Sequence, residues 1–517
     1  MKTSDLTARR AAAKKEYDAF SPIREEAFMY AIPFRKSAID KGEKRVDQAF
    51  DHTAMDAAFR FAGKVQQDLW PAGQQNFTLK PGPLVKDQAT RDALDKQLQD
   101  ITEVVQAGFE NGDWDMAFHE MALELSAGTG AILMLPPIPG DSERLWDPIN
   151  VPIDELYLES GPRNRISGIY WTRKMSYRVL AETYPDGKFN TDLKKLISEK
   201  PEDDLVVFLD TIWDTKQRRW MHYVWVKDQK QIIHTRSTRT CPWLTPRYFR
   251  VPGETYGRGV INLAMPTIKT TNTAQRLQLQ AAAIAMLGIY TVVDDGVFNP
   301  DLAALEPGAF WKVSRNGGPS GPSVSRFPDP RLDLSGIVID KLQMGIKATM
   351  MDQSLPPDGA SVRSATEILE RVKRLASDHI GAYGRLVREI VMPAIKHKLE
   401  IDYERGLIDT DLTIDQLIVS VQVESPIAMA REAQRVEKII NWLQMLLATY
   451  AQLQQPGRTE TVAKIDELLA DMGKSMGVPA KYIFTTEERT QKAQEQQKQE
   501  LAMAMAQAGA PEGDLAV

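Results

Sequence analysis

The chain has 517 residues, of which 43% are hydrophobic and 26% charged, so it can bury a large core and should form several domains. Its 64 basic and 70 acidic residues give a net charge of −6, which argues against a protein that grips nucleic acid along a basic face. Cys241 is the only cysteine, which excludes a disulfide framework and a cysteine-based zinc site and fits a reducing compartment.

The N-terminal quarter is predicted to be a layer of helices, because its apolar residues recur at helical spacing. The four ranges are 11–30, 51–69, 90–109 and 114–126. Residues 1–10 lack the apolar core of a signal peptide, and no apolar run in the chain reaches the roughly 18 residues needed to span a membrane. We therefore expect a soluble protein that is made inside the cell and makes no membrane contact.

The pattern then changes to strands. A short apolar run at 131–135 predicts a buried strand, and several further runs follow between turn residues. The predicted strands are 155–158, 166–172, 205–213, 220–226 and 232–234. We expect a mostly antiparallel β subdomain, and hence an α+β fold that is mainly helical.

The stretch from Tyr256 to Leu287 is unusual for a helix in a soluble protein. After a break at Pro266, no glycine or proline occurs before Gly288, which stands where a left-handed C-terminal cap belongs. Threonine and glutamine alternate here with apolar residues, so the helix has no single apolar stripe, and such a helix usually needs neighbours on several sides. Two interpretations remain open: a core helix of a large monomer, or a rod that packs against copies of itself.

A second helical run at 335–351 follows the first after a compact insert. The insert has strand-like pieces at 289–293, 310–313 and 324–327 and is too small to fold alone, so neighbouring copies should complete it. A loop with Pro356, Pro357, Asp358 and Gly359 comes next.

The last part of the chain is predicted to be mostly helical. A capping box at Ser364 opens a helix that runs to about residue 405 with a bend at Pro393. A strand at 417–423 follows, and the chain ends in a disordered tail at 508–517. The remaining helices are expected at 430–452, 462–472 and 486–507.

Two motifs suggest chemistry but are incomplete. Gly473-Lys474-Ser475 resembles the end of a phosphate-binding loop, but Leu468 stands where that motif needs glycine. His119-Glu120 begins like a zinc-protease helix, but Leu123 replaces the second histidine ligand. We therefore expect no enzyme, no catalytic residue, no metal and no cofactor.

Several short motifs occur in order along most of the chain. They are Arg24 to Pro33, Leu69-Trp70-Pro71, Gly130 to Pro136, Gly253 to Gly259, Ser364 to Ile368 and Thr485 to Gln491. Each motif is weak alone, but their order and the helix, insert, helix, loop arrangement are specific. In these features the chain resembles the head-to-tail connector, or portal protein, of short-tailed bacteriophages (podoviruses).

The resemblance implies a dodecameric ring around a DNA channel. It assigns the following regions: 1–256 wing, 257–287 first stem helix, 288–332 clip, 333–353 second stem helix, 354–363 tunnel loop, 364–425 wing helix and strand, 426–507 crown and 508–517 tail. It also implies partners, namely double-stranded DNA held transiently, the terminase large subunit, a scaffolding protein, the major capsid protein and a tail adaptor protein. The protein would be made in the host bacterial cytoplasm and would occupy the portal vertex of the virion, where DNA enters and leaves.

The candidate DNA-contacting residues follow from these regions. In the tunnel loop they are Pro356, Pro357, Asp358, Gly359 and Arg363; on the stem they are Arg258, Lys269, Arg276, Lys341 and Lys347. Each basic residue can equally be a solvated surface charge or part of an intersubunit salt bridge, and the loop can be an ordinary connection. Two other functions remain as alternatives: another ring component of the head-tail junction, such as an adaptor, or a DNA-packaging enzyme, which would need the phosphate-binding loop that the sequence lacks.

Overall fold

The computed structural model describes most of the chain up to residue 452. The described residues are 2–35, 49–137, 144–227, 231–287, 290–292, 324–326, 332–352, 380–410, 412, 414–424, 426–452 and the single positions 465, 468, 469, 472, 473 and 492. The predicted strand at 310–313, the loop at 354–363, the start of the helix at 364–379, the helices at 462–472 and 486–507 and the tail at 508–517 therefore lie outside the described residues, apart from those single positions.

The four predicted N-terminal helices are present: α1 (Thr3–Ala31), α2 (Thr53–Leu69), α3 (Gln88–Asn111) and α4 (Trp114–Leu125). Helix α1 begins at Thr3 rather than at residue 11. Its first turns are fixed by distant contacts, because Leu6 is fully buried and the Arg10 guanidinium lies 2.5 Å from the buried Asp210 carboxylate. A short 3-10 turn, η1 (Pro33–Arg35), follows α1.

Aromatic rings join the helical layer to the short strand β1 (Phe77–Pro81). The rings of Trp70 and Phe109 lie 4.6 Å apart between centroids, and Phe109 is 4.8 Å from Trp146. Trp114 stacks on Trp146 at 5.5 Å. Such pairs bury large apolar surfaces in a defined geometry, so this cluster holds the ends of α2, α3 and α4 together.

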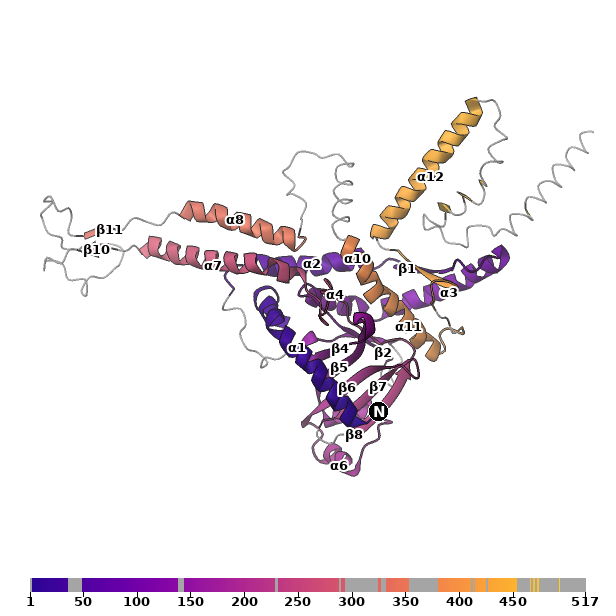
Figure 1. Ribbon diagram of the computed structural model, residues 1–517, viewed down its shortest axis with the longest axis horizontal. Helices are drawn as coiled ribbons and strands as arrows, with labels where there is room; N and C mark the ends of the chain where they lie inside the picture. The colour runs from indigo at the N-terminus through magenta and orange to yellow at the C-terminus, as the bar shows by residue number, and fades with distance from the viewer. Residues whose placement is uncertain are drawn as a thin grey trace, which may run out of the picture.

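The predicted β subdomain is an antiparallel five-stranded sheet in the order β4-β5-β6-β7-β8. Its strands are β4 (Leu156–Ser160), β5 (Ile166–Ser176), β6 (Asp204–Asp214), β7 (Arg219–Val226) and β8 (Gln231–Thr238). Helix α1 lies along this sheet, as Figure 1 shows. Consecutive strands are neighbours, so the sheet is a simple meander.

Two features beside this sheet were not fully predicted. Helices α5 (Tyr177–Thr183) and α6 (Thr191–Glu199) occupy the β5–β6 connection, where Ser176 and Asn190 cap their first turns. A separate three-stranded sheet has the order β3-β2-β9. Its central strand β2 (Ile132–Leu135) confirms the strand predicted at 131–135, whereas β3 (Asp147–Asn150), β9 (Trp243–Leu244) and their pairing with β2 were not predicted. The cap residues are the sequence signal that could have indicated α5 and α6.

Helices α7 (Val260–Leu287) and α8 (Leu332–Thr349) run side by side and project from the body (Figure 1). At their far end, β10 (Tyr290–Val292) and β11 (Val324–Arg326) pair as antiparallel strands. The predicted break at Pro266 is wrong, because α7 starts at Val260 and continues through this proline. Its first turns are buried at Ile261, Ala264 and Ile268, and this packing outweighs the hydrogen bond that proline removes.

The C-terminal half of the predicted bent helix consists of α10 (Ile380–Leu386), a π-helical turn η5 (Val387–Val391) and α11 (Met392–Glu404). The π turn lies directly before Pro393, whose ring excludes a normal helical hydrogen bond to Glu389.

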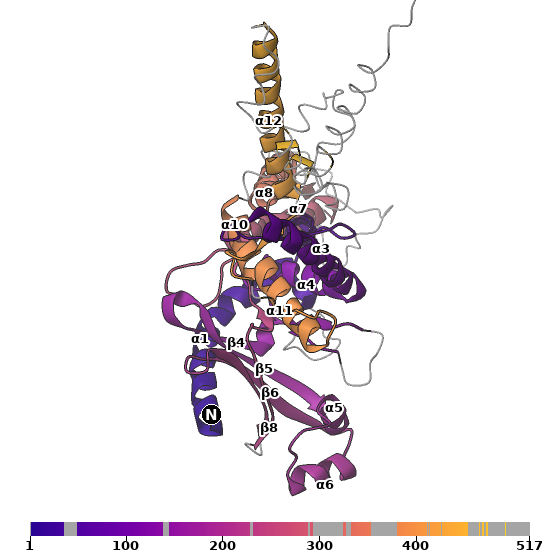
Figure 2. The same ribbon diagram turned by 90° about the vertical axis from the view of Figure 1, so that its right-hand side faces the viewer.

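Beyond α11, strand β12 (Val419–Val423) pairs with β1, and α12 (Pro426–Gln452) stands away from the body (Figure 2). No helix in the described parts of the chain is long and apolar enough to cross a membrane.

Candidate functional site

On the outer turns of α7, alanine and glutamine side chains are half-buried, whereas the large apolar side chains of two leucines are exposed. Beyond Thr271, the half-buried positions of α7 recur at a spacing of three and four, so they form one stripe beside α8. They are Ala274, Gln275, Gln278, Ala281, Ala282 and Ala285. By contrast, Leu277 is 54% exposed and Leu279 is 52% exposed.

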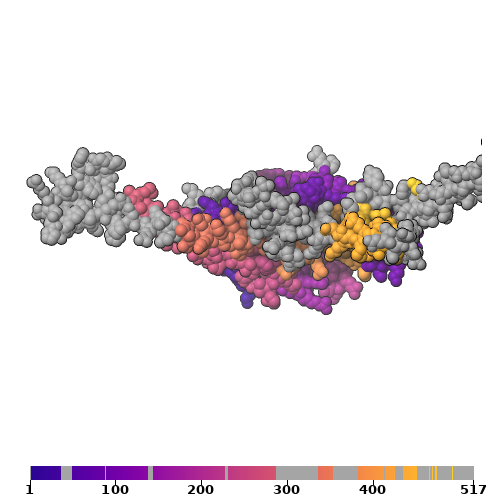
Figure 3. All heavy atoms as spheres, turned by 90° about the horizontal axis from the view of Figure 1, so that it is seen from above, coloured from indigo at the N-terminus to yellow at the C-terminus, as the bar shows by residue number. Residues whose placement is uncertain are grey.

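The two exposed leucines lie on opposite flanks of α7, because residues two apart are separated by about 200° around a helix axis. Helix α8 buries Ile339 and Ile346 but leaves Ile337, Val338 and Met344 more than half exposed. In the view from above in Figure 3, α8 lies at the surface of the projecting pair, and the side of α8 that faces the viewer is exposed. The pair therefore offers apolar contacts to further neighbours on more than one side.

Polar residues of the same helices bind the body at the base of the pair. The Asn272 side-chain oxygen accepts hydrogen bonds from the backbone nitrogens of Phe50 at 2.6 Å and Asp51 at 3.2 Å. One carboxylate oxygen of Asp51 accepts from Gln343 of α8 and from Thr53, each at 2.9 Å. Asp51 thus links the start of α2 to both long helices.

Two of the five predicted DNA-contacting residues on these helices are paired with acids of the same chain. Arg258 precedes α7 rather than lying on it, and its guanidinium donates two hydrogen bonds to Glu254 at 2.6 and 2.8 Å. These hydrogen bonds raise the pKa of Arg258 and lower that of Glu254. Lys269 of α7 forms an ion pair with Glu26 of α1.

The other three predicted residues are exposed. Arg276, Lys341 and Lys347 make no ion pair with any residue that the structure describes. Lys341 and Lys347 are six residues apart, which separates them by about 120° around α8, so they do not form one row. The predicted loop residues Pro356, Pro357, Asp358, Gly359 and Arg363 lie outside the described part of the chain.

The short segment 247–249 joins both long helices to the π-helical turn. The Tyr248 hydroxyl donates a hydrogen bond of 3.3 Å to the sulfur of Met351, which lies just after the end of α8. The backbone carbonyl of Tyr248 accepts a hydrogen bond of 2.8 Å from Arg385 of α10. Phe249 forms a backbone bridge with Arg258, just before α7. No sequence pattern marks Tyr248, because these contacts come from four separate parts of the chain.

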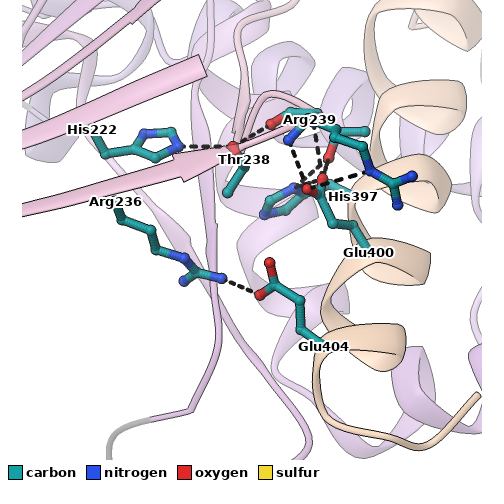
Figure 4. Close-up of polar contacts among 8 residues, drawn as sticks. His222, Arg236, Thr238, Arg239, His397, Glu400 and Glu404 are labelled. Atoms are coloured by element: carbon teal, nitrogen blue, oxygen red, sulfur yellow. Dashed lines mark hydrogen bonds and ion pairs between the residues drawn. The ribbon is translucent and has the colours of Figure 1, made fainter. Parts of the chain in front are cut away.

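A polar network connects the five-stranded sheet to α11 (Figure 4). Glu400 accepts hydrogen bonds from the backbone nitrogens of Arg239 at 2.7 Å and Thr240 at 2.9 Å. One turn further along α11, Glu404 pairs with Arg236 of β8 at 2.5 Å. These bonds fix the end of the sheet against the helix.

The half-buried His222 ring continues this network, and its hydrogen-bond partners determine which ring nitrogen carries the proton. Trp243 donates to the Thr211 hydroxyl at 3.0 Å, and that hydroxyl lies 3.0 Å from His222 Nδ1. His222 Nε2 lies 2.8 Å from the Thr238 hydroxyl, which donates to the Thr240 carbonyl at 2.7 Å. A neutral imidazole with its proton on Nε2 satisfies every contact in this chain.

The charges in this network suit a structural role. Burial, reinforced by His397 and Arg236, lowers the pKa of His222 to about 3, so the ring is neutral at pH 7. Burial alone would raise the pKa of Glu400, but the adjacent His397 ring and the donors on residues 239 and 240 lower it to about 2. Within the described residues, no group of three or more acidic, histidine or cysteine side chains is placed to hold a metal ion.

Comparison with known proteins identifies the kind of molecule to which this geometry belongs. A family model described as bacteriophage head to tail connecting protein matches residues 3–483. The chain belongs to this family. No curated protein matches it significantly. As a head-to-tail connecting protein, it contacts capsid and tail components of the phage particle, and the role of this family is structural.

Proposed function

We propose that this connector is a portal protein, which assembles into a closed dodecameric ring at one vertex of a podovirus capsid and passes DNA through its central channel. The observation that carries this proposal is the pattern of apolar side chains on α7 and α8. Leu277 and Leu279 point to opposite flanks and are half exposed, so they would be covered if each helix pair packed between two others. Head-to-tail contacts of this kind close into a ring when the rotation from each subunit to the next adds up to a full turn.

In this ring, α7 and α8 are the stem around the channel, and the β10–β11 hairpin belongs to the clip, which projects beyond the stem. The N-terminal helices, the five-stranded sheet, α10, α11 and β12 form the wing, while α12 opens the crown. Residues 354–363 form the tunnel loop. This division is supported by the way α7 and α8 carry the hairpin away from the body (Figure 1).

The exposed Arg276, Lys341 and Lys347 are the proposed transient DNA contacts on the stem, with Arg363 repeated around the channel at the tunnel loop. A channel wall rich in lysine and arginine would neutralise many phosphates and release many DNA counterions, which would hold the DNA tightly. The net charge of −6 and these few basic side chains suit a channel that guides DNA without holding it. We propose that Arg258 and Lys269 instead stabilise the subunit, because each is paired with an acid of the same chain.

The ring then serves as the platform for its partners. The clip docks the terminase large subunit during packaging and the tail adaptor protein afterwards, while the outer surface contacts the scaffolding and major capsid proteins. The protein is made in the host cytoplasm and has no enzymatic activity of its own.

Native mass spectrometry and electron microscopy of the purified protein test this proposal. We expect a ring of about a dozen subunits with an open channel, which forms without other phage proteins. A population that stays monomeric or dimeric at micromolar concentration, over a range of salt concentrations, would refute the ring. Replacement of residues 288–332 by a short Gly-Ser linker should leave the ring intact and abolish terminase docking.

A further inference from the structure

An arginine cluster gathers where three separate segments meet on the body, and the proposed channel does not account for it. Its core is the side chains of Arg247, Arg250 and Arg385, which meet at the backbone of residues 163–164 and 248. Arg163 belongs to the first of these backbone segments, and the exposed Arg388 follows Arg385 by three residues, about one helical turn, on the same continuous helix. Arg250 donates to the carbonyl oxygens of residues 163 and 164, at 2.9 and 3.0 Å. Arg247 donates to the same carbonyl of residue 164 at 3.3 Å, and Arg385 donates to the carbonyl of residue 248 at 2.8 Å.

Positive charge exceeds negative charge in this cluster. Glu389 is the carboxylate that pairs with Arg247, at 3.4 Å. Arg250, Arg385 and the exposed Arg388 form no ion pair with any residue in the described ranges. Backbone carbonyls orient guanidinium groups but do not neutralise them, so a bound anion would stabilise the arrangement.

Arg247, the buried member of the cluster, is in an unfavourable electrostatic environment. The Arg247 side chain is only 5% exposed, and its Nε has no hydrogen-bond partner. Burial and the neighbouring Arg250 and Arg385 lower the pKa of Arg247, against the attraction of Glu389. A phosphate group nearby would offset this repulsion.

The composition of the surface indicates the class of partner. None of the large apolar residues that are exposed among the described residues belongs to segments 161–165, 247–250 or 385–389. Protein interfaces need an apolar core, whereas nucleic-acid interfaces are polar and strongly positive. The stem flanks, with Leu277 and Leu279, show the opposite pattern.

We propose that this arginine cluster is a second DNA-binding surface, which contacts the phosphate backbone of double-stranded DNA independently of the stem and tunnel loop. Guanidinium groups bind phosphate oxygens through paired N–H donors, and carbonyl anchoring fixes their direction beforehand. Contacts of this type position DNA without reading its sequence, so binding should be insensitive to sequence and sensitive to salt.

Fluorescence anisotropy tests the proposal, with the purified full-length protein and a labelled DNA duplex of about 30 base pairs, long enough to cover several phosphate contacts. The main variant combines Arg250→Gln, Arg385→Gln and Arg388→Gln. A second, double variant combines only Arg250→Gln and Arg388→Gln, so that the hydrogen bond from Arg385 to the carbonyl of residue 248 is kept. The matched control is Arg218→Gln with Arg219→Gln, two exposed arginines at the turn between β6 and β7. Arg276→Gln serves as the channel control.

We expect the triple variant to bind DNA at least about tenfold more weakly at low salt and to reduce the slope of log affinity against log salt by about 2 to 3. The double variant should reduce that slope by about 2, and the surface control should leave it unchanged. Unchanged affinity and slope in both cluster variants would overturn the proposal, whatever Arg276→Gln does. A cluster that binds a labelled polyglutamate peptide, but not DNA, would also overturn it and would indicate an acidic protein partner.

Discussion

The exposed leucines of the stem give the strongest quantitative prediction. Full burial of a leucine side chain is worth about 1.5–3 kcal/mol. Because Leu277 and Leu279 are 54% and 52% exposed in the subunit, covering each one is worth roughly half of that full value, or about 0.8–1.5 kcal/mol. The double variant Leu277→Ser with Leu279→Ser should therefore weaken each subunit contact by about 1.5–3 kcal/mol, or about 10- to 150-fold in its association constant.

Sedimentation velocity over a dilution series measures this effect as the concentration at which rings dissociate. The isolated subunit should keep its helicity and thermal stability, because substitutions at exposed positions change folding stability by only about 0.5 kcal/mol. Leu84→Ser is the matched control, since this leucine is 59% exposed outside the stem. If the double variant dissociates at the same concentration as the unmodified protein, the stem flanks are not the subunit interface.

Three further predictions concern buried charges. The Lys398 and Asp402 side chains are fully buried and form an ion pair at 2.5 Å. In chemical denaturation, Lys398→Met should lower the free energy of unfolding by about 3–5 kcal/mol, because it leaves the Asp402 charge unpaired. The double variant with Asp402→Leu should recover most of that loss; an equal loss in both variants would refute this reasoning. Burial raises the pKa of Glu124 from 4.5 to about 7, so the protonated carboxyl is favoured in the folded state. The stabilising contribution of the protonated Glu124 carboxyl is complete below pH 4.5 and is lost as the pH rises towards 7. The melting temperature of Glu124→Gln should therefore change less with pH over that interval than that of the unmodified protein, and an unchanged pH profile would contradict the assignment. The pKa of His222 is lowered from 6.5 to about 3, so acidification below pH 6.5 should loosen the contact between the sheet and α11. The protection factors of α11 amides, which correct hydrogen exchange for its intrinsic pH dependence, should fall in the unmodified protein and change less with pH in His222→Gln; an equal fall in both would contradict this.

Local patterns predicted much of this fold. A run without glycine or proline located α7, although that helix has no single apolar stripe. Alternation of apolar residues located all five strands of the large sheet, and spacing of three and four located the N-terminal helices. These elements are each stabilised by a face whose pattern is visible in a short window. The meander order also needed no long-range information, because its neighbouring strands are consecutive in the chain.

The errors occurred where distant residues decide the structure. The first turns of α1 depend on the pairing of Arg10 with Asp210, and the continuity of α7 through Pro266 depends on burial against the body. The pairing of Lys269 with Glu26 joins residues far apart in the chain, so its charge looked available in the sequence. Glu254 stands four residues before Arg258, and that spacing could have indicated their ion pair.

The arrangement of polar and apolar residues along the stem also explains why its sequence lacks a single apolar stripe. Near the base, Asn272 and Gln343 are polar because they bind the segment around Asp51. Further out, alanines face α8 and leucines face away, so the pair buries little apolar surface within one subunit. Short side chains allow close approach but contribute little burial, and a long helix gains most of its stability from tertiary packing. In the proposed ring, neighbouring subunits would complete the packing of these outer turns, so we expect ring closure and stiffening of the channel wall to occur together.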